Sequence, residues 1–394
     1  IDRHGQNGDP HAIKVPMGLT QGKAGAAHPY DFSFSGVKTA VARWVESEQA
    51  AGHEIPVDDV CASLADSVAT VLARKAMRGC RQYDSNTLIV GGGYHGKSTM
   101  LSALQMGVYD HVAGDGREFV LADETAVKLR AEEGRSIRNT DISMFINDLP
   151  NGKNTKSFST PDASGSTSQA AGVLEGIEAG SRLFLIDEDT SATNFMVRDD
   201  FMQQVISREK EPITPFLERA GDLYEKAGVS TILVAGSSGA SCYIADHIIQ
   251  MDCYKPVEIT ERVKALCKEH QAPRTQAPGF AVPGFAEAYA AGKSKNAKVK
   301  TFGRDTFSID RETVDLRYVE QMADFEQTSA LAYLTRYALE QLADGRKTLR
   351  QLAAELQKRM ETKGWDSLTG SYVPCGLAKP RIQEIFAALD RYRG

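Results

Sequence analysis

The 394-residue sequence predicts an α/β fold whose central sheet is mostly parallel. Three compact apolar runs, Thr87–Val90, Leu183–Ile186 and Val229–Ala235, have the length and composition of buried central strands. Helix-like patterns separate these runs, and such alternation is typical of parallel sheets that are covered by helices. A hydrophobic fraction of 42% and a charged fraction of 25% are ordinary for globular domains, so a sizeable core is expected.

Helices are predicted before the first strand and near the end of the chain. Apolar residues recur at three- and four-residue steps, which places them on one helix face. The segment 135–168 is polar, and we interpret it as a long loop. The predicted helices are Val37–Val45, Val60–Met77, Thr99–Met106, Val314–Leu342 and Leu349–Met360. The predicted domains are an N-terminal fragment (1–84), a core (85–265), a linker or irregular arm (266–310) and a C-terminal helical unit (311–394).

Charge and cysteine usage narrow the class of protein. A net charge of −6 disfavours extensive nonspecific binding to nucleic acid. No apolar run approaches the ~20 residues of a membrane helix, so no membrane partner is expected. The six cysteines contain no CxxC pair, which predicts reduced thiols in a cytoplasmic protein. The first residue is not Met, so the chain is interpreted as a fragment, a processed piece, or a fused or truncated frame. A small basic cluster keeps RNA as a candidate partner: Lys293, Lys295, Lys298 and Lys300.

A glycine-rich segment follows the first predicted strand. It reads GGGYHGKS from Gly91 to Ser98 and fits G-x-x-x-x-G-K-[ST]. Glycines allow backbone N–H groups to surround phosphate oxygens, and the following helix start favours an anion. Lys97 is expected to reach the β- and γ-phosphates of ATP, and Ser98 to bind Mg²⁺. His95 either touches a phosphate or packs beneath the loop. The nucleotide-binding candidates here are Gly91, Gly92, Gly93, Tyr94, His95, Gly96, Lys97, Ser98 and Thr99.

Two acids end the second predicted strand in the peptide RLFLIDEDTSATN. Ligands of open α/β sheets bind at the carboxyl ends of the strands, where Asp187 and Glu188 are predicted to lie. We expect Asp187 to hold Mg²⁺, directly or through water. Glu188 is the candidate catalytic residue that orients or deprotonates the attacking water, together with Lys97 on the phosphates. A solvated acidic loop is the alternative interpretation.

The peptide DASGSTSQAAGVLEGIEAG (162–180) precedes the acidic strand. The order of phosphate loop, this peptide and the acidic strand resembles ATP-binding-cassette (ABC) ATPases. The resemblance implies that Ser164–Gln169 is the signature peptide and that Ser191–Asn194 is the D-loop. It further implies a homodimer with two shared ATP sites, in which Ser164, Gly165, Ser166 and Gln169 bind the nucleotide of the other subunit. A Ser/Thr cap for the helix that follows is compatible with this interpretation.

More specifically, the peptides GGGYHGKSTML, GRSIRNTDIS and LIDEDTSATNFMVRD look like the predicted ATPases of the ABC class. The resemblance is dense over 86–260 and extends to VDLRYVEQMADFEQTSALAYLTRYA near the end of the chain. A relative associated with RNA editing implies RNA or protein remodelling as the work that hydrolysis drives.

Several features depart from the ABC pattern. The strand after the D-loop runs into VAGSSGA without the switch histidine, which leaves Ser237 or Ser238 as the γ-phosphate sensor. Asp141–Asn147 occupies the place of the Q-loop without a clear glutamine. Arg135 and Arg138 are candidates for phosphate or partner contacts, and solvated arginines are the favoured interpretation. The base-stacking aromatic is missing upstream, where Tyr83 is the nearest aromatic residue.

Residues 1–84 resemble another family, the tRNA threonylcarbamoyladenosine transferases of the TsaD type. The motifs are GDPHAIKVP, YDFSFSGVKTA and DVCASLADSVATVLARKAMRGC. The implied metal-binding histidines lie in a lobe upstream of this segment, so we expect packing helices here. Two alternatives to the ATPase therefore stay open: a tRNA-modification protein or fragment, and a nucleotide-gated scaffold with little turnover.

Overall fold

In the computed structural model of the chain, the described residues are 4, 7–9, 11–16, 35–65, 67, 85–112, 116–117, 120–198, 200–207, 210–270, 272, 277–285, 287–291, 297–370 and 372–394. The chain divides into two compact units, Ile1–Asp84 and Ser85–Gly394. In the first unit, helix α3 spans Ser35–Ala50 and includes the predicted helix Val37–Val45. Residues 57–65 and Ser67 are also helical, and most of the remaining predicted helix up to Met77 lies outside the described residues.

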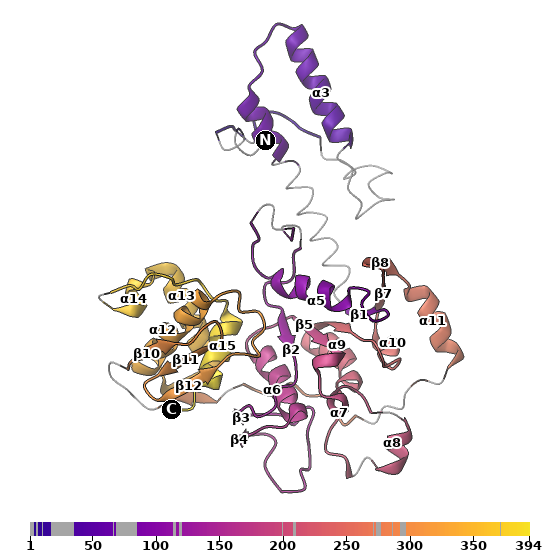
Figure 1. Cartoon of the computed structure of the whole chain (residues 1–394), viewed down its shortest axis with the longest axis vertical. Helices are drawn as coiled ribbons and strands as arrows, with labels where there is room; N and C mark the ends of the chain where they lie inside the picture. The colour runs from indigo at the N-terminus through magenta and orange to yellow at the C-terminus, as the bar shows by residue number, and fades with distance from the viewer. Residues whose placement is uncertain are drawn as a thin grey trace. The chain divides into compact units, whose positions relative to one another are not determined.

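The second unit contains a six-stranded sheet in the order β2-β5-β6-β1-β7-β8 (Figure 1). The first five strands run parallel, and only β8 is antiparallel to its neighbour β7. This arrangement confirms the predicted α/β class with a mostly parallel sheet. The strands are β1 (Asn86–Val90), β2 (Val127–Leu129), β5 (Leu183–Asp187), β6 (Ser230–Val234), β7 (His247–Asp252) and β8 (Lys255–Glu258).

Apolar side chains fill both faces of the sheet, because successive residues of a strand point to opposite sides. On one face, Ile89 and Val234 pack with Leu101 of helix α5 (Lys97–Met106). On the other face, Leu88 and Leu233 join a larger core with helices α6 (Gly165–Glu178) and α9 (Ala220–Ala227). The parallel strands therefore belong to a sheet whose two faces are both covered by packed apolar side chains, and this packing fixes the position of their carboxyl ends.

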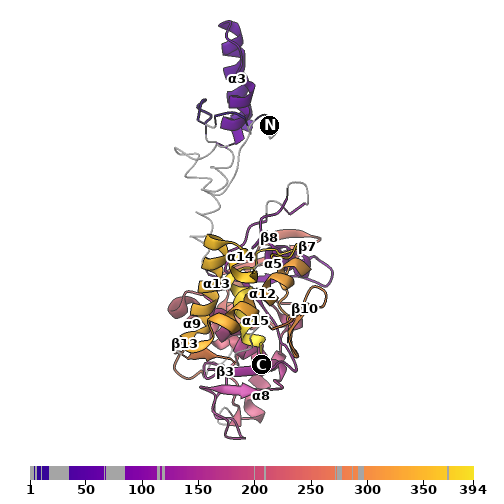
Figure 2. The same ribbon diagram turned by 90° about the vertical axis from the view of Figure 1, so that its left-hand side faces the viewer.

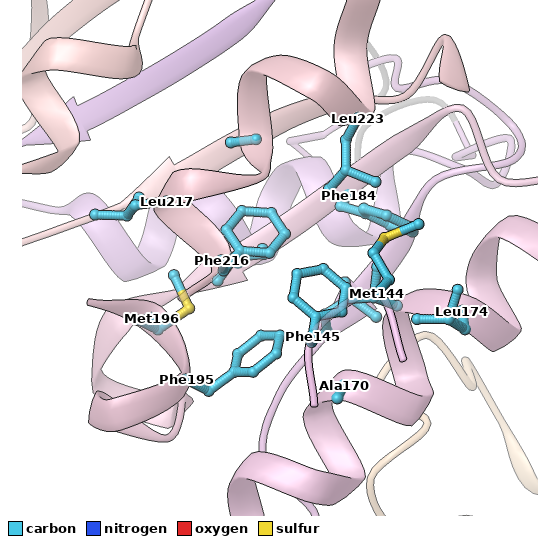
Figure 3. Packing of buried hydrophobic residues seen from close by; sticks show 14 of the residues in the cluster. Met144, Phe145, Ala170, Leu174, Phe184, Phe195, Met196, Phe216, Leu217 and Leu223 are labelled. Carbon is cyan, nitrogen blue, oxygen red and sulfur yellow. The ribbon is translucent and has the colours of Figure 1, made fainter. Parts of the chain in front are cut away.

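Three phenylalanines support the chain that follows β5 (Figure 3). The Phe145 ring lies 5.0 Å from that of Phe195 and 6.3 Å from that of Phe216, centroid to centroid, and all three side chains are fully buried. Phe195 belongs to the short helix α7 (Thr193–Met196), which comes directly after the acidic segment. This packing fixes the position of the predicted D-loop. Other short elements here are η1 (Glu188–Thr190), α8 (Asp200–Val205), η3 (Phe216–Glu218) and α10 (Ser241–Ile244).

The polar segment 135–168 is not a simple loop. It contains the antiparallel pair β3 (Ile137–Thr140) and β4 (Phe158–Thr160), and it buries Ile142 and Phe145 completely. The few apolar residues of this segment thus attach it to the core, although its overall composition resembles that of a solvated loop.

The C-terminal part combines helices with small sheets (Figure 2). The predicted helix Val314–Leu342 is wrong at its start: Asp324 caps helix α12, which begins at Phe325, and Val314 lies in a strand that pairs with β11. The range 266–310, predicted to be irregular, also contributes strands. The elements are α11 (Thr260–Glu269), β9 (Ala288–Ala290), β10 (Val299–Thr301), β11 (Thr306–Ile309), β12 (Glu312–Asp315), α12 (Phe325–Gln341), β13 (Asp344–Thr348), α13 (Leu349–Lys363), α14 (Asp366–Thr369) and α15 (Ile382–Arg391).

Candidate active site

The glycine-rich loop joins β1 to α5, as the sequence predicts. Gly91 and Gly96 have φ angles of 151° and 98°, which side chains rarely tolerate. A Cβ atom on Gly91 would lie 2.6 Å from the Met251 carbonyl oxygen, and one on Gly96 would lie 2.7 Å from Cδ1 of Tyr254. Both glycines are therefore required by backbone conformation and by close packing against the β7–β8 hairpin.

Lys97 folds back over this loop. Its ammonium group donates hydrogen bonds to the carbonyl oxygens of Gly91 (2.8 Å) and Gly92 (3.0 Å). It also reaches the loop after β6, because a Cβ atom on Gly236 would lie 3.8 Å from the Lys97 Nζ. Ser98 follows in the first turn of α5, where free N–H groups and the helix dipole favour an anion. The loop thus gathers a cation and backbone donors at one helix start.

Glu188 faces the same loop after β6. Its Oε2 accepts hydrogen bonds from the N–H groups of Gly236 (2.9 Å) and Ser237 (3.1 Å), and its Oε1 accepts one from the Ser237 hydroxyl (2.9 Å). Partial burial raises the pKa of this carboxyl group, but the hydrogen bonds outweigh burial and hold the pKa below its usual value. The site therefore holds a carboxylate that is ionised at neutral pH.

Asp187 ends β5 and is only 6% exposed. It is in register with Val234 and hence with Ile89, so its side chain points to the sheet face that α5 covers. One carboxylate oxygen accepts a hydrogen bond from the Asp189 N–H at 3.2 Å. Asp187 and Ser98 of α5 lie on the same side of the sheet, and a carboxylate and a hydroxyl are hard oxygen donors of the kind that Mg²⁺ prefers.

The predicted signature peptide begins α6. The Ser164 side chain caps this helix by accepting from the Thr167 N–H at 3.4 Å, and Ser164 itself is exposed. The adjacent Gly165 packs closely, since a Cβ atom there would lie 3.3 Å from that of Ala131. The side-chain hydrogen bonds found for Ser164 in the described part of the chain all go to Thr167. The structure therefore confirms the helix cap and leaves the Ser164 hydroxyl on the surface.

Two further signature residues contact the predicted D-loop instead of the surface. The Ser166 hydroxyl donates to Oδ1 of Asn194 at 2.9 Å. Gln169 is 1% exposed; its amide donates to the Ser191 hydroxyl and accepts from the Ala192 N–H, both at 2.9 Å. The structure thus joins the predicted signature peptide to the predicted D-loop within one chain, and a nucleotide contact of Ser166 and Gln169 stays a prediction.

His95 packs against the β7–β8 turn. Its Nδ1 accepts a hydrogen bond from the Cys253 N–H at 3.0 Å and lies 3.5 Å from Oδ1 of Asp252. These three side chains form the one group of His, Cys, Asp or Glu residues in the described ranges whose ligand atoms lie within 4.8 Å of one another. Tyr94, in the phosphate loop itself, is 98% exposed.

One expectation from the sequence needs correction, and one feature of the site was missed. Arg135 is buried, not solvated: its guanidinium group contacts the carboxylates of Glu132, Glu175 and Asp390. The ring of Tyr254 lies beside Gly96 of the phosphate loop, and sequence reasoning missed this residue because it lies far downstream of the loop. Tyr83 lies outside the described residues. The turn signal between β7 and β8 was the available clue to a residue beside the loop.

Comparisons with known proteins agree with this geometry. The model of the ABC_ATPase P-loop domain matches residues 57–285. The chain belongs to the ABC_ATPase family. The match begins within the first compact unit, ahead of the boundary at 85. A second model, the MRB1590 C-terminal domain, matches residues 298–394.

Another set of relatives matches a shorter stretch. Over 104 residues, which is 26% of this chain and 30% of each relative, the chain is 91% identical to the tRNA N6-adenosine threonylcarbamoyltransferase of Bifidobacterium longum and 77% identical to that of Bifidobacterium adolescentis. The enzyme of Corynebacterium diphtheriae is 43% identical over 101 residues. The chain spans about 30% of the length of these curated relatives.

Among solved structures, a post-hydrolysis dimer of an ATP-binding cassette bound to ADP and Pi aligns with 45% of this chain and 86% of its own, at 13% identity and a TM-score of 0.27. No helix in the described part of the chain is long and apolar enough to cross a membrane.

Proposed function

We propose that the chain binds and hydrolyses ATP in a Mg²⁺-dependent reaction. The observation that carries this proposal is the meeting of Lys97 and Glu188 at the Gly236–Ser237 loop. A cation that neutralises phosphate and a carboxylate that orients water are the two groups that phosphoryl transfer to water requires. Here they are brought together from different parts of the sheet, at the carboxyl ends of its parallel strands.

The residues of the site promote hydrolysis mainly by holding the phosphates and the attacking water in place. Lys97 exchanges its bonds to the Gly91 and Gly92 carbonyls for phosphate oxygens, while the N–H groups at the start of α5 hold the same anion. Glu188 orients the attacking water and accepts its proton. Ser98 and Asp187 hold Mg²⁺, which neutralises charge on the phosphate oxygens.

The proposal includes a homodimer with shared ATP sites. Its support is the exposed Ser164 at the start of α6, where a hydroxyl and helix N–H groups can meet the phosphate of a second copy. The bonds from Ser166 and Gln169 to the D-loop would transmit movement of this peptide to the segment that follows Glu188.

Turnover of Mg-ATP by three variants tests the hydrolysis. Glu188→Gln keeps the shape of the side chain but removes the base, so turnover is expected to fall about 10²- to 10⁴-fold. Lys97→Ala is expected to lose ATP binding. The matched control is Asp189→Asn, an exposed acid next in the chain, which should hydrolyse ATP like the original chain. Equal turnover by Glu188→Gln and Asp189→Asn would contradict the proposal.

RNA or protein remodelling in the cytoplasm is the proposed use of the hydrolysis. The resemblance to predicted ATPases of the ABC class and the Lys298 and Lys300 pair support it. Stimulation of turnover by single-stranded RNA, lost on Lys298→Ala with Lys300→Ala, is the expected result. Unchanged turnover with RNA present would remove RNA as the partner.

A second candidate function rests on the identity of 91% over 104 residues to a tRNA N6-adenosine threonylcarbamoyltransferase. The segment would then contribute to tRNA modification. Transfer of a threonylcarbamoyl group to tRNA, measured with added Fe or Zn, tests it. Lys97→Ala separates the two functions, because it should abolish ATP turnover and leave the transfer unchanged.

A further inference from the structure

The turn between β7 and β8 is fastened to the phosphate loop. Its two central residues, Cys253 and Tyr254, have φ angles of 48° and 67°, as a tight two-residue hairpin turn requires. The Cys253 N–H donates to Nδ1 of His95 at 3.0 Å, and the Tyr254 N–H donates to the His95 carbonyl oxygen at 3.1 Å. Strands β7 and β8 lie beside β1 (Figure 1), and these two hydrogen bonds hold the Tyr254 backbone at a set place beside the loop.

The Tyr254 ring touches the start of α5 and still faces solvent. A Cβ atom on Gly96, the residue that caps this helix, would lie 2.7 Å from Cδ1 of the ring. Nevertheless, Tyr254 is 68% exposed. A large aromatic surface is thus kept open directly beside the helix start that gathers Lys97 and the anion-binding N–H groups.

The order of the strands indicates how a bound nucleotide would lie across the phosphate loop. Glu188 follows β5 and Ser237 follows β6, on one side of β1, whereas Tyr254 follows β7 on the other side. Because water attacks the terminal phosphate, this phosphate belongs at Glu188. The rest of the nucleotide then extends across the loop toward β7, and its base arrives at Tyr254.

We infer that Tyr254 is the platform on which the base of the bound nucleotide stacks. The inference rests on the proposed nucleotide binding, and it provides the aromatic contact that the sequence upstream of the loop does not show. Every base offers a π face, so stacking tolerates any base. ATP and GTP should therefore bind with similar affinity, and pyrimidine nucleotides, which stack over less area, should bind more weakly.

Tyr372 offers a matched control. It is also an exposed aromatic residue, with an exposed fraction of 74%. It lies between α14 and α15, outside the phosphate loop and the β7–β8 hairpin, so we expect it to contribute nothing to nucleotide binding.

Binding of two probes to the full chain tests the inference. One probe is the β,γ-imido analogue of ATP, and the other is inorganic tripolyphosphate, which has no base. Tyr254→Ala should weaken binding of the analogue about 5- to 150-fold and leave binding of tripolyphosphate unchanged. Tyr254→Phe and Tyr372→Ala should both bind the analogue like the original chain.

Three results would overturn the inference alone: an unchanged affinity of Tyr254→Ala for the analogue, an equal loss of affinity for both probes, or an equal loss of affinity for the analogue in Tyr372→Ala. An original chain that binds tripolyphosphate as tightly as the analogue would also overturn it while leaving the phosphate site intact. Failure of the original chain to bind either probe would overturn both this inference and the proposed function.

Discussion

The Ser237 hydroxyl donates a hydrogen bond to Glu188 at 2.9 Å and so occupies one oxygen of the candidate catalytic carboxylate. The Ser237 N–H occupies the other oxygen at 3.1 Å. Ser237, a candidate for the role of the switch histidine in ABC ATPases, thus contacts the candidate catalytic acid directly. Both bonds favour the ionised carboxylate, and they help to keep its pKa below the usual value despite partial burial.

Ser237→Ala tests this contact through the pH dependence of turnover. Loss of the hydroxyl removes one of the groups that lower the Glu188 pKa, so the pKa rises toward its ordinary value. The acidic limb of the pH–turnover profile should then move to higher pH. Ser238→Ala is the control, because only the backbone of Ser238 acts on Glu188. A profile of Ser237→Ala that coincides with that of Ser238→Ala would refute the contact.

Gln169→Leu tests the link between signature peptide and D-loop. The substitution removes the hydrogen bonds of the buried Gln169 amide to the half-buried Ser191 hydroxyl and Ala192 N–H, which costs about 1–3 kcal/mol in the free energy of unfolding. Urea unfolding measures it. The same change at Gln357, on the surface-facing side of α13, should alter this free energy by less than about 0.5 kcal/mol. Equal effects at both sites would show that the link contributes no stability.

Arg135 joins the signature helix to the end of the chain. Its guanidinium contacts Glu175 of α6 and, at 2.8 Å, Asp390 of α15. Arg135→Met removes the cation that contacts both buried carboxylates, so we expect a loss of about 3–5 kcal/mol in the free energy of unfolding.

The control for Arg135 is Arg182→Met, which breaks a surface ion pair with Asp123. Arg182 has a side chain that is 63% exposed, and its pair should contribute about 0–1 kcal/mol. Unfolding in denaturant measures the free energy of unfolding of both variants. Similar losses would mean that the buried charges of Arg135 are solvated in the folded protein.

Glu178, at the last turn of α6, predicts a dependence of stability on pH. Burial, with the nearby charges of Asp390 and Glu175, raises its pKa from 4.5 to about 7. The folded state therefore binds more protons than the unfolded state between these values, and the free energy of unfolding falls as pH rises from about 4.5 to about 7.

Glu178→Gln should remove this part of the slope, so the variant gains stability relative to the original chain at pH 8 and gains less at pH 5. Unfolding in urea at both values measures the difference. Glu225→Gln, on an exposed position of α9, controls for the loss of one negative charge. A stability difference that is the same at pH 5 and pH 8 would contradict the assignment.

The sequence predicts the centre of the fold well, and it identifies the loop between β1 and α5, because both signals are local. Apolar runs identify β1, β5 and β6, and the pattern G-x-x-x-x-G-K-S from Gly91 to Ser98 identifies the phosphate loop. The missed features depend on distant pairing. Arg135 meets a carboxylate that is 255 residues away, and Tyr254 reaches the loop only because β7 pairs with β1. The start of α12 was missed because Val314 continues the helical spacing while its backbone pairs with Phe307.

The mass of Glu188→Gln in solution, with and without Mg-ATP, tests the central claim most directly. This variant should bind ATP without hydrolysing it, so two copies should stay joined around the shared nucleotides. We expect a doubled mass with Mg-ATP, the mass of one chain with Mg-ADP, and no doubling when Lys97→Ala is added. A variant that binds ATP but keeps the mass of one chain would contradict the shared site.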